Sequence, residues 1–577
     1  MKKSVRIIVS LIVTIVLSAL VFYTTLPAIN LQSDTFWTFL TCCIVIFGVS
    51  YFLVDFLYRK KKNKGAKLDF KLKKSKSVVI FICLLAIPVV VLAVGSLVSS
   101  TFFHAEAYSN LIEVPEKNFA EDMPESETIN NIALMDTQTA ITMGQRALTE
   151  TGNVSQYTVS DAYRQINYKK APQKISTLEY ADFFKWFSNK ETGIPGYVMV
   201  DPVVSNSAKY VPLSKPIKYT ESGFFEDDLM RKLRFSYPTK IFGNCSFEID
   251  EEGNPYYIVA CMKPRIGMFG AYDVNEVIIF DPVSGAHSIY SVTPGAETSD
   301  VPAWVDNVFT GELASEKYNW YGTLKNGYWN SVVGNKDCKV TTDDYGYIVI
   351  EDDIWFFTGV TSVGIDESNI GFIVSNARTG EYKYYAVSGA EEYSAMQSAE
   401  GQVQEKGYDA SFPSLVNVAG QPTYIMVLKD NGGLVKLYAL VNVDQYAIVA
   451  TGATQDEAKD EYLKLLKQNG IIDKIPEKAE TVDTDSATAD IEIAEINVYT
   501  VGGEATFYIT AVDRQIYKER LCDNESLLLL KKGDKLSVKY TVNPEGTLVR
   551  DIISFSQIKE EAPANGEETP ANAEPTT

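Results

Sequence analysis

Three long apolar stretches open the chain, over Val5–Ile29, Phe36–Tyr58 and Val78–Phe103. Each stretch has about 23 residues or more, and about 20 helical residues span the hydrocarbon core of a bilayer. The pattern therefore predicts three transmembrane helices within residues 1–103. A cleaved signal peptide is the alternative for the first stretch, but that stretch is long and no Ala-x-Ala cleavage site follows it.

Beyond residue 103 the apolar positions form short alternating stretches bounded by turn residues, with brief helical stripes between them. Alternation with a period of two predicts strands, and apolar residues three or four positions apart predict helices. Such helical stripes lie at Ala181–Lys190, Ser222–Phe235, Val301–Tyr321, Glu391–Lys406 and Thr454–Gln468. The pattern predicts an α+β fold in which each stripe packs on an antiparallel sheet.

A first motif places an Asp or Asn directly after an apolar strand and a Tyr nine residues later. Its copies are Asp201 with Tyr210, Asp281 with Tyr290, and Asn376 with Tyr385. In the last two copies a glycine, Gly285 or Gly380, comes four residues after the Asp or Asn. Asp and Asn start turns by bonding nearby backbone, and Gly supplies a positive φ. Each copy therefore predicts a β-hairpin.

A second motif, Gly-x-Pro followed by a Tyr two residues later, also occurs three times. Its copies are Gly193 with Pro195, Gly253 with Pro255, and Gly420 with Pro422. Gly turns the chain, and Pro begins the outgoing strand where the ladder needs no N–H donor. With the helical stripes between the two motifs, the predicted repeat unit is hairpin–helix–hairpin, forming a four-stranded sheet covered by one helix.

These patterns divide the chain into six parts. They are a transmembrane region at 1–103, an N-terminal ectodomain segment with a partial repeat at 104–195, a tandem α+β repeat domain at 196–470, a linker at 471–488, a small β-barrel at 489–558 and a disordered tail at 559–577. The five short strands expected in the barrel, one of them at Ser526–Leu530, are typical of an OB- or SH3-like fold. The tail is rich in Pro, Ala and Glu, which cannot form a core.

The repeat unit resembles the PepSY-like modules of exported bacterial proteins, in which hairpins with Asp-x-x-(Ser/Thr)-Gly turns pack on a helix. The resemblance covers roughly residues 156–450 and lies in Asp281, Ser284 and Gly285, and in Asn376, Thr379 and Gly380. The copies here are longer than usual, and the first lacks the Gly. The whole chain also resembles uncharacterised membrane-anchored exported proteins of Gram-positive bacteria. The PepSY resemblance implies a role in regulating exported proteases or in assisting folding.

Charge predicts the orientation in the membrane. Ten Lys and Arg residues lie between positions 59 and 76, in the loop joining the second and third apolar stretches. Basic loops remain cytoplasmic, so we expect a cytoplasmic N-terminus, a plasma-membrane location and an extracytoplasmic region after about residue 104. Residues 104–577 carry 40 basic and 71 acidic residues, a net charge of −31. Such a surface repels nucleic acid and anionic lipid headgroups.

Two cysteines suggest a cross-link. Cys245 and Cys261 lie at equal distances in sequence from Gly253, so a symmetric hairpin would place them opposite each other. We predict a cross-strand disulfide, and the alternative is two buried thiols. The cysteine content is too low for an ectodomain built mainly on disulfides.

No motif in the sequence indicates a reaction. The chain has two histidines and no nucleotide-binding, metalloprotease or hydrolase signature, so we assign no catalytic residue, metal ligand or cofactor. The 34 tyrosines suit sheet packing or a surface for peptide or glycan ligands. We predict a non-catalytic binding or scaffold protein of the cell envelope, integral to the membrane and recognising another envelope protein or a peptide. The alternatives are a regulator of exported proteases or folding factor, and a cell-wall-active enzyme of unrecognised type.

Overall fold

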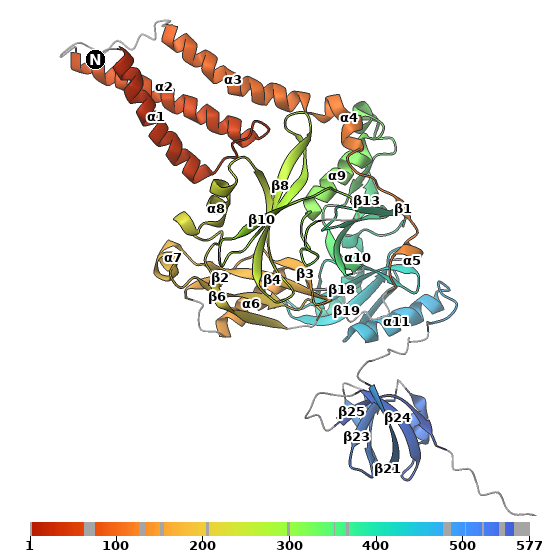
Figure 1. Cartoon of the computed structure of the whole chain (residues 1–577). Coiled ribbons are helices and arrows are strands. Elements are labelled where there is room, and N and C mark those ends of the chain that lie inside the picture. The colour runs from red at the N-terminus through yellow and green to blue at the C-terminus, as the bar shows by residue number, and fades with distance from the viewer. Residues whose placement is uncertain are drawn as a thin grey trace, which may run out of the picture. The chain divides into compact units, whose positions relative to one another are not determined.

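The computed structural model describes the chain apart from several short stretches. The described residues are 3–62, 76–125, 134–135, 137–150, 155–203, 207–296, 300–350, 352–364, 368–476, 486–501, 504–521, 524–541 and 549–558. The chain forms two compact units, residues 1–476 and residues 477–577. The first unit contains the apolar helices and four antiparallel sheets, and the second is a barrel (Figure 1). The mixed α+β class is confirmed.

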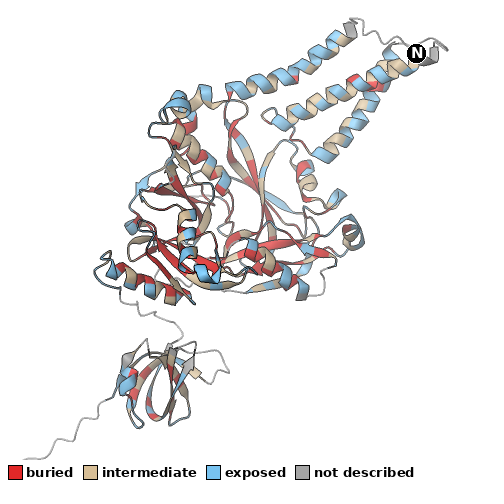
Figure 2. Cartoon of the chain, turned by 180° about the vertical axis from the view of Figure 1, so that it is seen from behind, coloured by how far each residue is buried: buried red, intermediate tan, exposed pale blue. Residues whose placement is uncertain are grey.

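Three long helices begin the first unit: α1 (Lys3–Thr25), α2 (Asp34–Lys62) and α3 (Lys76–Val98). Each is long and apolar enough to cross a membrane, as the hydrophobic pattern predicts. Most of their apolar side chains are exposed and few are buried, so these helices are largely pale blue and tan in Figure 2. An ion pair between Arg6 and Asp55 joins α1 to α2. Because lipid would cover the exposed apolar faces, these helices associate the protein with a membrane.

The first sheet contains β2 (Tyr157–Val159), β3 (Arg164–Tyr168), β4 (Ala171–Tyr180), β5 (Ile194–Val200) and β6 (Ala208–Ile217). Its order is β2-β4-β5-β6, with β3 also paired to β4. The short helix α7 (Phe183–Asn189) connects β4 to β5, and α6 (Thr137–Glu150), which the hydrophobic pattern did not predict, packs against β5 and β6.

The second sheet has the order β10-β9-β8-β7 and is an antiparallel meander. Its strands are β7 (Ile241–Ile249), β8 (Pro255–Ile266), β9 (Gly270–Phe280) and β10 (His287–Ser291). The 3₁₀ turn η2 (Phe225–Asp227) and the helix α8 (Leu229–Ser236) precede it, and α9 (Gly311–Leu324) follows it. The predicted helices over 222–235 and 301–321 are therefore shorter than their apolar stripes suggested.

The third and fourth sheets repeat this meander. The third contains β11 (Lys339–Thr341), β12 (Gly346–Ile350), β13 (Asp353–Ser362), β14 (Asn369–Asn376) and β15 (Tyr382–Tyr385), with β1 (Glu116–Lys117) added in parallel to β15. The fourth contains β16 (Asp409–Ala410), β17 (Ser414–Val418), β18 (Gln421–Lys429), β19 (Val435–Asn442) and β20 (Val449–Gly452). Helix α10 (Glu392–Gln402) lies between these sheets in sequence, and α11 (Gln455–Gln468) packs on the last.

The predicted grouping of hairpins needs correction. The sequence pattern placed the helix between two hairpins of one sheet, but α8 and α10 instead connect the last hairpin of one sheet to the first hairpin of the next. The second and fourth sheets therefore receive a Gly-x-Pro hairpin first and an Asp or Asn hairpin second. Hydrophobic periodicity identifies each hairpin but carries no information on which neighbour it pairs with, because pairing depends on contacts distant in sequence.

The second unit is a closed barrel with the order β21-β22-β23-β25-β24. Its strands are β21 (Ser486–Val501), β22 (Glu504–Ala511), β23 (Ile516–Arg520), β24 (Lys535–Thr541) and β25 (Val549–Gln557). The strand predicted at 526–530 is instead the 3₁₀ helix η5 (Glu525–Leu529), whose N-cap Asn524 accepts a hydrogen bond from the Ser526 N–H. In η5 Leu527 is buried while Leu528 and Leu529 are exposed, which a strand's alternation does not produce.

Candidate functional site

The residues of the first motif occupy equivalent turns. The side chains of Asp201, Asp281 and Asn376 each accept a hydrogen bond from the N–H two residues ahead, at 2.9, 2.8 and 2.9 Å. All three residues end or directly follow the third strand of the meander in their sheets, β5, β9 and β14. Gly285 and Gly380 have φ of +77° and +73°, as the turns require.

The Tyr residues of this motif lie on the outgoing strands, where Tyr210, Tyr290 and Tyr385 pair with Val198, Val277 and Phe372. A fourth turn of this kind went unrecognised in the sequence. The Asn442 side chain, at the end of β19, accepts the N–H of Gln445 at 2.7 Å. The residue nine positions after Asn442 is Thr451 rather than Tyr, which hid the match.

The glycines of the second motif do not share one role. Gly253 (φ +84°) and Gly420 (φ +75°) lie in hairpin turns, and Pro255 and Pro422 lie at the start of the outgoing strands β8 and β18. Gly193 (φ +71°) instead follows α7, where its N–H donates to the Asn189 carbonyl at 2.8 Å. Pro195 then follows at the start of β5.

The predicted register around Gly253 is wrong. The hairpin is symmetric about Glu252 rather than Gly253, so Cys245 lies opposite Val259, and beyond a bulge between Phe242 and Cys245 the residue opposite Cys261 is Phe242. Both cysteines are free thiols in the structure. Burial raises the pKa of the Cys261 thiol to about 12, which keeps it protonated and unreactive at neutral pH.

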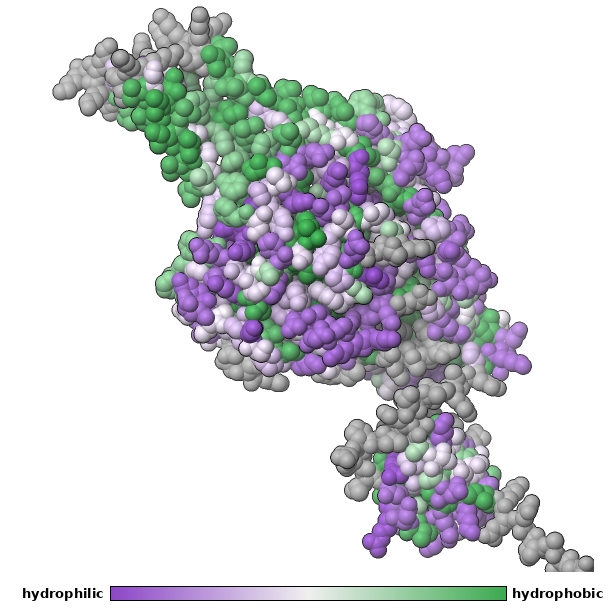
Figure 3. All heavy atoms as spheres, in the orientation of Figure 1, coloured by the Kyte–Doolittle hydropathy of each residue, from purple (hydrophilic) through white to green (hydrophobic). Residues whose placement is uncertain are grey.

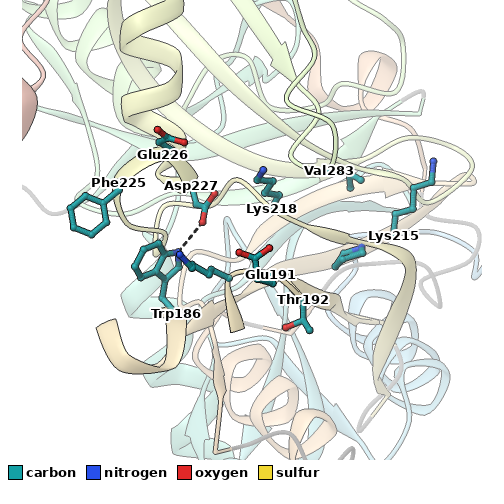
Figure 4. Close-up of a pocket in the computed structure, with 12 residues that line it drawn as sticks. Trp186, Glu191, Thr192, Lys215, Lys218, Phe225, Glu226, Asp227 and Val283 are labelled. Atoms are coloured by element: carbon teal, nitrogen blue, oxygen red, sulfur yellow. Dashed lines mark hydrogen bonds between the residues drawn. The ribbon is translucent and has the colours of Figure 1, made fainter. Parts of the chain in front are cut away.

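A solvent-accessible pocket of about 560 Å³ lies where the first sheet meets the turn after β9. It is lined by Trp186, Lys190, Glu191, Thr192, Gly193, Lys215, Pro216, Lys218, Phe225, Glu226, Asp227 and Val283 (Figure 4). Two motif turns contribute to it, since Gly193 is a lining residue and Val283 belongs to the Asp281 turn. The backbone N–H groups of Lys218 and Tyr219 donate to the Pro282 carbonyl at 2.9 and 3.0 Å, which fixes that turn against the first sheet.

Helix α7 forms one wall of the pocket. Its N-cap, Asp182, accepts hydrogen bonds from the N–H groups of Phe184 and Lys185 at 2.7 and 2.9 Å. The sequence placed Phe183, Trp186 and Phe187 together on a buried stripe, but Trp186 alone of these is buried, with 4 % of its surface exposed. The indole N–H of Trp186 donates to the Asp227 carboxylate at 3.2 Å and so connects α7 to η2.

A cluster of exposed aromatic rings continues from this wall onto the surface. We call it the aromatic ridge, and it consists of Phe183, Phe184, Phe187, Phe224 and Phe225, which are 37, 75, 59, 38 and 53 % exposed. The sequence Phe183–Phe187 holds four aromatic residues in five positions, more than one buried stripe of a helix can accommodate. That excess is the signal by which the ridge could have been found.

The backbone at η2 is held in an unusual conformation. Phe225 has φ of +55°, a conformation that costs a bulky residue about 1–3 kcal/mol and that clusters at functional sites. Its carbonyl accepts a hydrogen bond from the guanidinium of Arg231 at 2.7 Å, and the Asp227 carbonyl accepts one from the Thr220 N–H at 3.1 Å. These bonds keep the Phe225 ring pointing outward beside the pocket (Figure 4).

A second hollow, of about 350 Å³, adjoins the first and shares Lys218, Phe225, Glu226 and Asp227 with it. Its other lining residues are Tyr23, Tyr219, Arg231, Lys232 and Phe235. Tyr23 lies in the last turns of α1, and the Arg231 guanidinium stacks on its ring at 4.3 Å from the ring centre. The two hollows therefore form one groove, which extends from α7 to the end of an apolar helix.

The charges along this groove favour an acidic ligand. The side chains of Lys190, Lys215, Lys218 and Lys232 line it, and none of them forms an ion pair with another described residue. Three acids, Glu191, Glu226 and Asp227, also line the groove, so its basic residues, which include Arg231, exceed the acids by two. Asp227 is engaged by the Trp186 indole (Figure 4). Burial raises the pKa of Asp227, against the opposing effects of the indole and of Lys218.

Among the described residues no group of three or more His, Cys, Asp or Glu side chains is arranged to hold a metal ion. The groove combines apolar rings with flexible cations, which can bind an extended amphipathic chain. Comparison with protein-family models and with curated proteins found no match for this chain. The resemblance to PepSY-like modules therefore stays a prediction.

Proposed function

We propose that the protein is a non-catalytic, membrane-anchored binding protein of the cell envelope, and that its groove holds a segment of another envelope protein. The observation that carries the proposal is the aromatic ridge beside a groove lined by four lysines. Water-exposed phenylalanines are costly unless a partner covers them, and clusters of this kind mark interaction sites. The lysines add charge complementarity for an acidic segment, although the chain beyond the apolar helices is strongly acidic.

The position of the groove favours a partner that is itself held at the membrane. Because the second hollow reaches Tyr23 at the end of α1, a segment just outside a neighbouring membrane anchor would meet the groove without a long linker. Such a segment needs apolar residues for the ridge and carboxylates for the lysines. Glycoside hydrolysis, by contrast, uses two carboxyl groups facing each other across a cleft. The engagement of Asp227 by Trp186 supports binding over this reaction.

The proposed orientation places the groove outside the cell. The basic loop at 59–76 supports a cytoplasmic N-terminus, so that an odd number of spans leads to an extracytoplasmic sheet region. We also propose that the sheets are PepSY-like modules and that the barrel is OB- or SH3-like, since it closes over five strands. An epitope tag fused after Thr577 should be accessible to antibody on intact cells from which the wall has been removed. Accessibility only after permeabilisation would reverse this orientation.

The binding proposal is tested by photocrosslinking in intact cells. Phe184 is replaced by p-benzoylphenylalanine, and the same replacement at Val349 on β12, which is 37 % exposed, serves as the control. We expect a reproducible protein adduct from position 184 and none from position 349. Lys218→Glu, introduced into the protein that carries p-benzoylphenylalanine at position 184, should reduce the adduct several-fold, because it reverses one charge of the groove.

Two results would overturn the binding proposal. One is an equal adduct pattern at positions 184 and 349. The other is the absence of any partner at position 184 together with degradation of a cell-wall polymer by the purified protein, which would favour an enzyme.

A further inference from the structure

The sheet region is attached to the outer end of α3 through a hairpin tip. The Ser99 hydroxyl, one residue beyond α3, accepts hydrogen bonds from the N–H groups of Met268 and Phe269 at 2.8 and 3.1 Å. The ring of Phe269 lies directly on Gly95, where an added Cβ would come within 2.5 Å of it. The tip between β8 and β9 therefore sits against the last turn of an apolar helix.

The same region is attached to the connection between α1 and α2. The buried guanidinium of Arg234 donates to the Leu26 carbonyl at 2.9 Å, and the Ile29 N–H donates to the Pro238 carbonyl at 2.7 Å. The Tyr272 hydroxyl on β9 donates to the Gln32 carbonyl at 2.7 Å. Attachment at both places fixes one side of the sheet region at the level where the apolar helices end (Figure 1).

On this side, one turn displays apolar side chains outward. The π-helical turn η3 (Asn330–Gly334) and the residue before it expose Trp329, Val332 and Val333 by 68, 54 and 77 %. Asn330 lies on the inner side, where its amide donates to the Lys336 carbonyl at 2.9 Å. The turn is thus amphipathic, with the apolar side chains of Val332 and Val333 largely exposed.

This turn is continuous with the end of α3. The helix α4 (Thr101–Ser109) begins after Ser100, and the ring of Phe102 contacts those of Tyr328 and Trp329 at centroid distances of 5.1 and 6.0 Å. Phe102 and its neighbour Phe103 are themselves 46 and 56 % exposed. In Figure 3 the green apolar surface of the helices continues onto the adjoining part of the sheet region.

We propose that Phe102, Phe103, Trp329, Val332 and Val333 form a leaflet patch that inserts into the outer leaflet of the bilayer that α3 crosses. Phe102 lies four residues beyond the last residue of α3, with the non-helical Ser99 and Ser100 between them, so it stays within about 14 Å of the end of that helix. Amphipathic segments at this depth bury their apolar side chains among the acyl chains, and aromatic residues concentrate there. The contact is apolar, so the acidic character of the ectodomain does not oppose it.

We assign the patch to lipid rather than to a protein partner because it adjoins the exposed apolar end of α3, where Val98 is 50 % exposed. Insertion would add a further attachment beside the three helices and stop the sheet region from tilting on them. The groove beside α1 would then keep a constant height above the membrane. This inference rests on α3 crossing a membrane but not on the groove binding a partner.

Photocrosslinking to lipid tests the patch in the full-length protein within native membranes. Val333 is replaced by p-benzoylphenylalanine in cells fed a fatty acid with a terminal alkyne, and Phe184, which is similarly exposed but lies on α7, is the matched control. We expect lipid adducts at position 333 in several-fold excess over position 184. A protein adduct in place of lipid at position 333, or equal lipid adducts at both positions, would overturn the proposal.

A second measurement does not depend on the photoreactive residue. The protein is reconstituted in vesicles with phosphatidylcholine brominated near the headgroup, and the tryptophan fluorescence lost on Trp329→Phe is compared in brominated and ordinary lipid. We expect the contribution of Trp329 to be quenched several-fold by bromine. An unquenched contribution, with the variant folded as judged by its unfolding temperature, would place Trp329 in water and refute insertion.

Discussion

A buried ion pair holds α9 against β9, and its removal should weaken the first unit strongly. The Lys317 ammonium donates to both oxygens of the Asp273 carboxylate, at 3.1 and 2.9 Å, and the two side chains are 1 and 6 % exposed. The ammonium also lies 5.5 Å from the ring centre of Phe309. Burial lowers the pKa of Lys317, and Asp273 opposes that shift. The buried ammonium therefore depends on the carboxylate beside it to compensate its charge.

The expected loss in the free energy of unfolding follows from the charge that each variant leaves unpaired. Lys317→Met removes the ammonium and leaves the Asp273 carboxylate buried, an arrangement that costs about 3–5 kcal/mol. Arg265, whose Nε lies 3.9 Å from the carboxylate, remains as a partial partner. At an effective dielectric constant of about 20, charges about 4 Å apart attract by about 4 kcal/mol before desolvation is counted. We therefore expect the lower end of the range, about 3 kcal/mol.

Asp273→Asn should cost a similar amount, because it leaves the ammonium without its carboxylate. The double variant, with Lys317→Met and Asp273→Asn together, removes both charges and should cost only about 1 kcal/mol, since replacing a buried pair by neutral groups is often nearly neutral. The coupling between the two sites should thus reach several kcal/mol, well above the roughly 0.3–0.5 kcal/mol within which independent sites add.

The assay is thermal unfolding of the full-length protein in detergent, followed by tryptophan fluorescence. All six tryptophans lie in the first unit, so this signal reports that unit and excludes the barrel. Each single variant should lower the unfolding temperature by roughly 3–4 °C, and the double variant by clearly less than either. Additive losses in the double variant, or single variants that unfold like the wild type, would refute the reasoning.

Three further predictions concern other parts of the molecule. Burial raises the pKa of the Glu392 carboxyl to about 7, above its unfolded value of about 4.5. The contribution of Glu392 to stability is therefore full below about pH 4.5 and is lost as the pH rises through 7. Glu392→Gln should remove this pH dependence and raise the unfolding temperature at pH 8. Gly389→Ala should lower the unfolding temperature, because the new Cβ would lie 2.1 Å from the Val443 carbonyl oxygen. Gly401→Ala, which lies in α10 with open space around it, should instead stabilise the protein by about 0.5–1 kcal/mol. Equal effects of the two variants on the unfolding temperature would contradict this packing. Alkylation under denaturing conditions should give the same mass for Cys245 and Cys261 with or without prior reduction, and a difference would show a disulfide that the register does not predict.

The local features of the fold were predictable because short stretches of sequence determine them. The three apolar helices follow from length and composition alone, since a bilayer needs only a continuous apolar helix. The turns at Asp281 and Asn376 also follow from local chemistry, because each side chain bonds backbone within its own turn. The helix stripes were predicted too long at Val301–Tyr321, where α9 begins only at Gly311, and at Ser222–Phe235, where part of the stripe packs as the irregular turn η2.

What only the tertiary structure decided depends on contacts between residues far apart in sequence. The assignment of hairpins to sheets, and the register that separates Cys245 from Cys261, result from strand pairing that periodicity cannot specify. The candidate groove is of the same kind, since Trp186 on α7 and Asp227 on η2 lie 41 residues apart in sequence and meet only in the folded chain. The sequence determined which elements form, through local propensity and solvation. Their packing determined which apolar side chains stayed outside, because a core accepts only those that fit its neighbours.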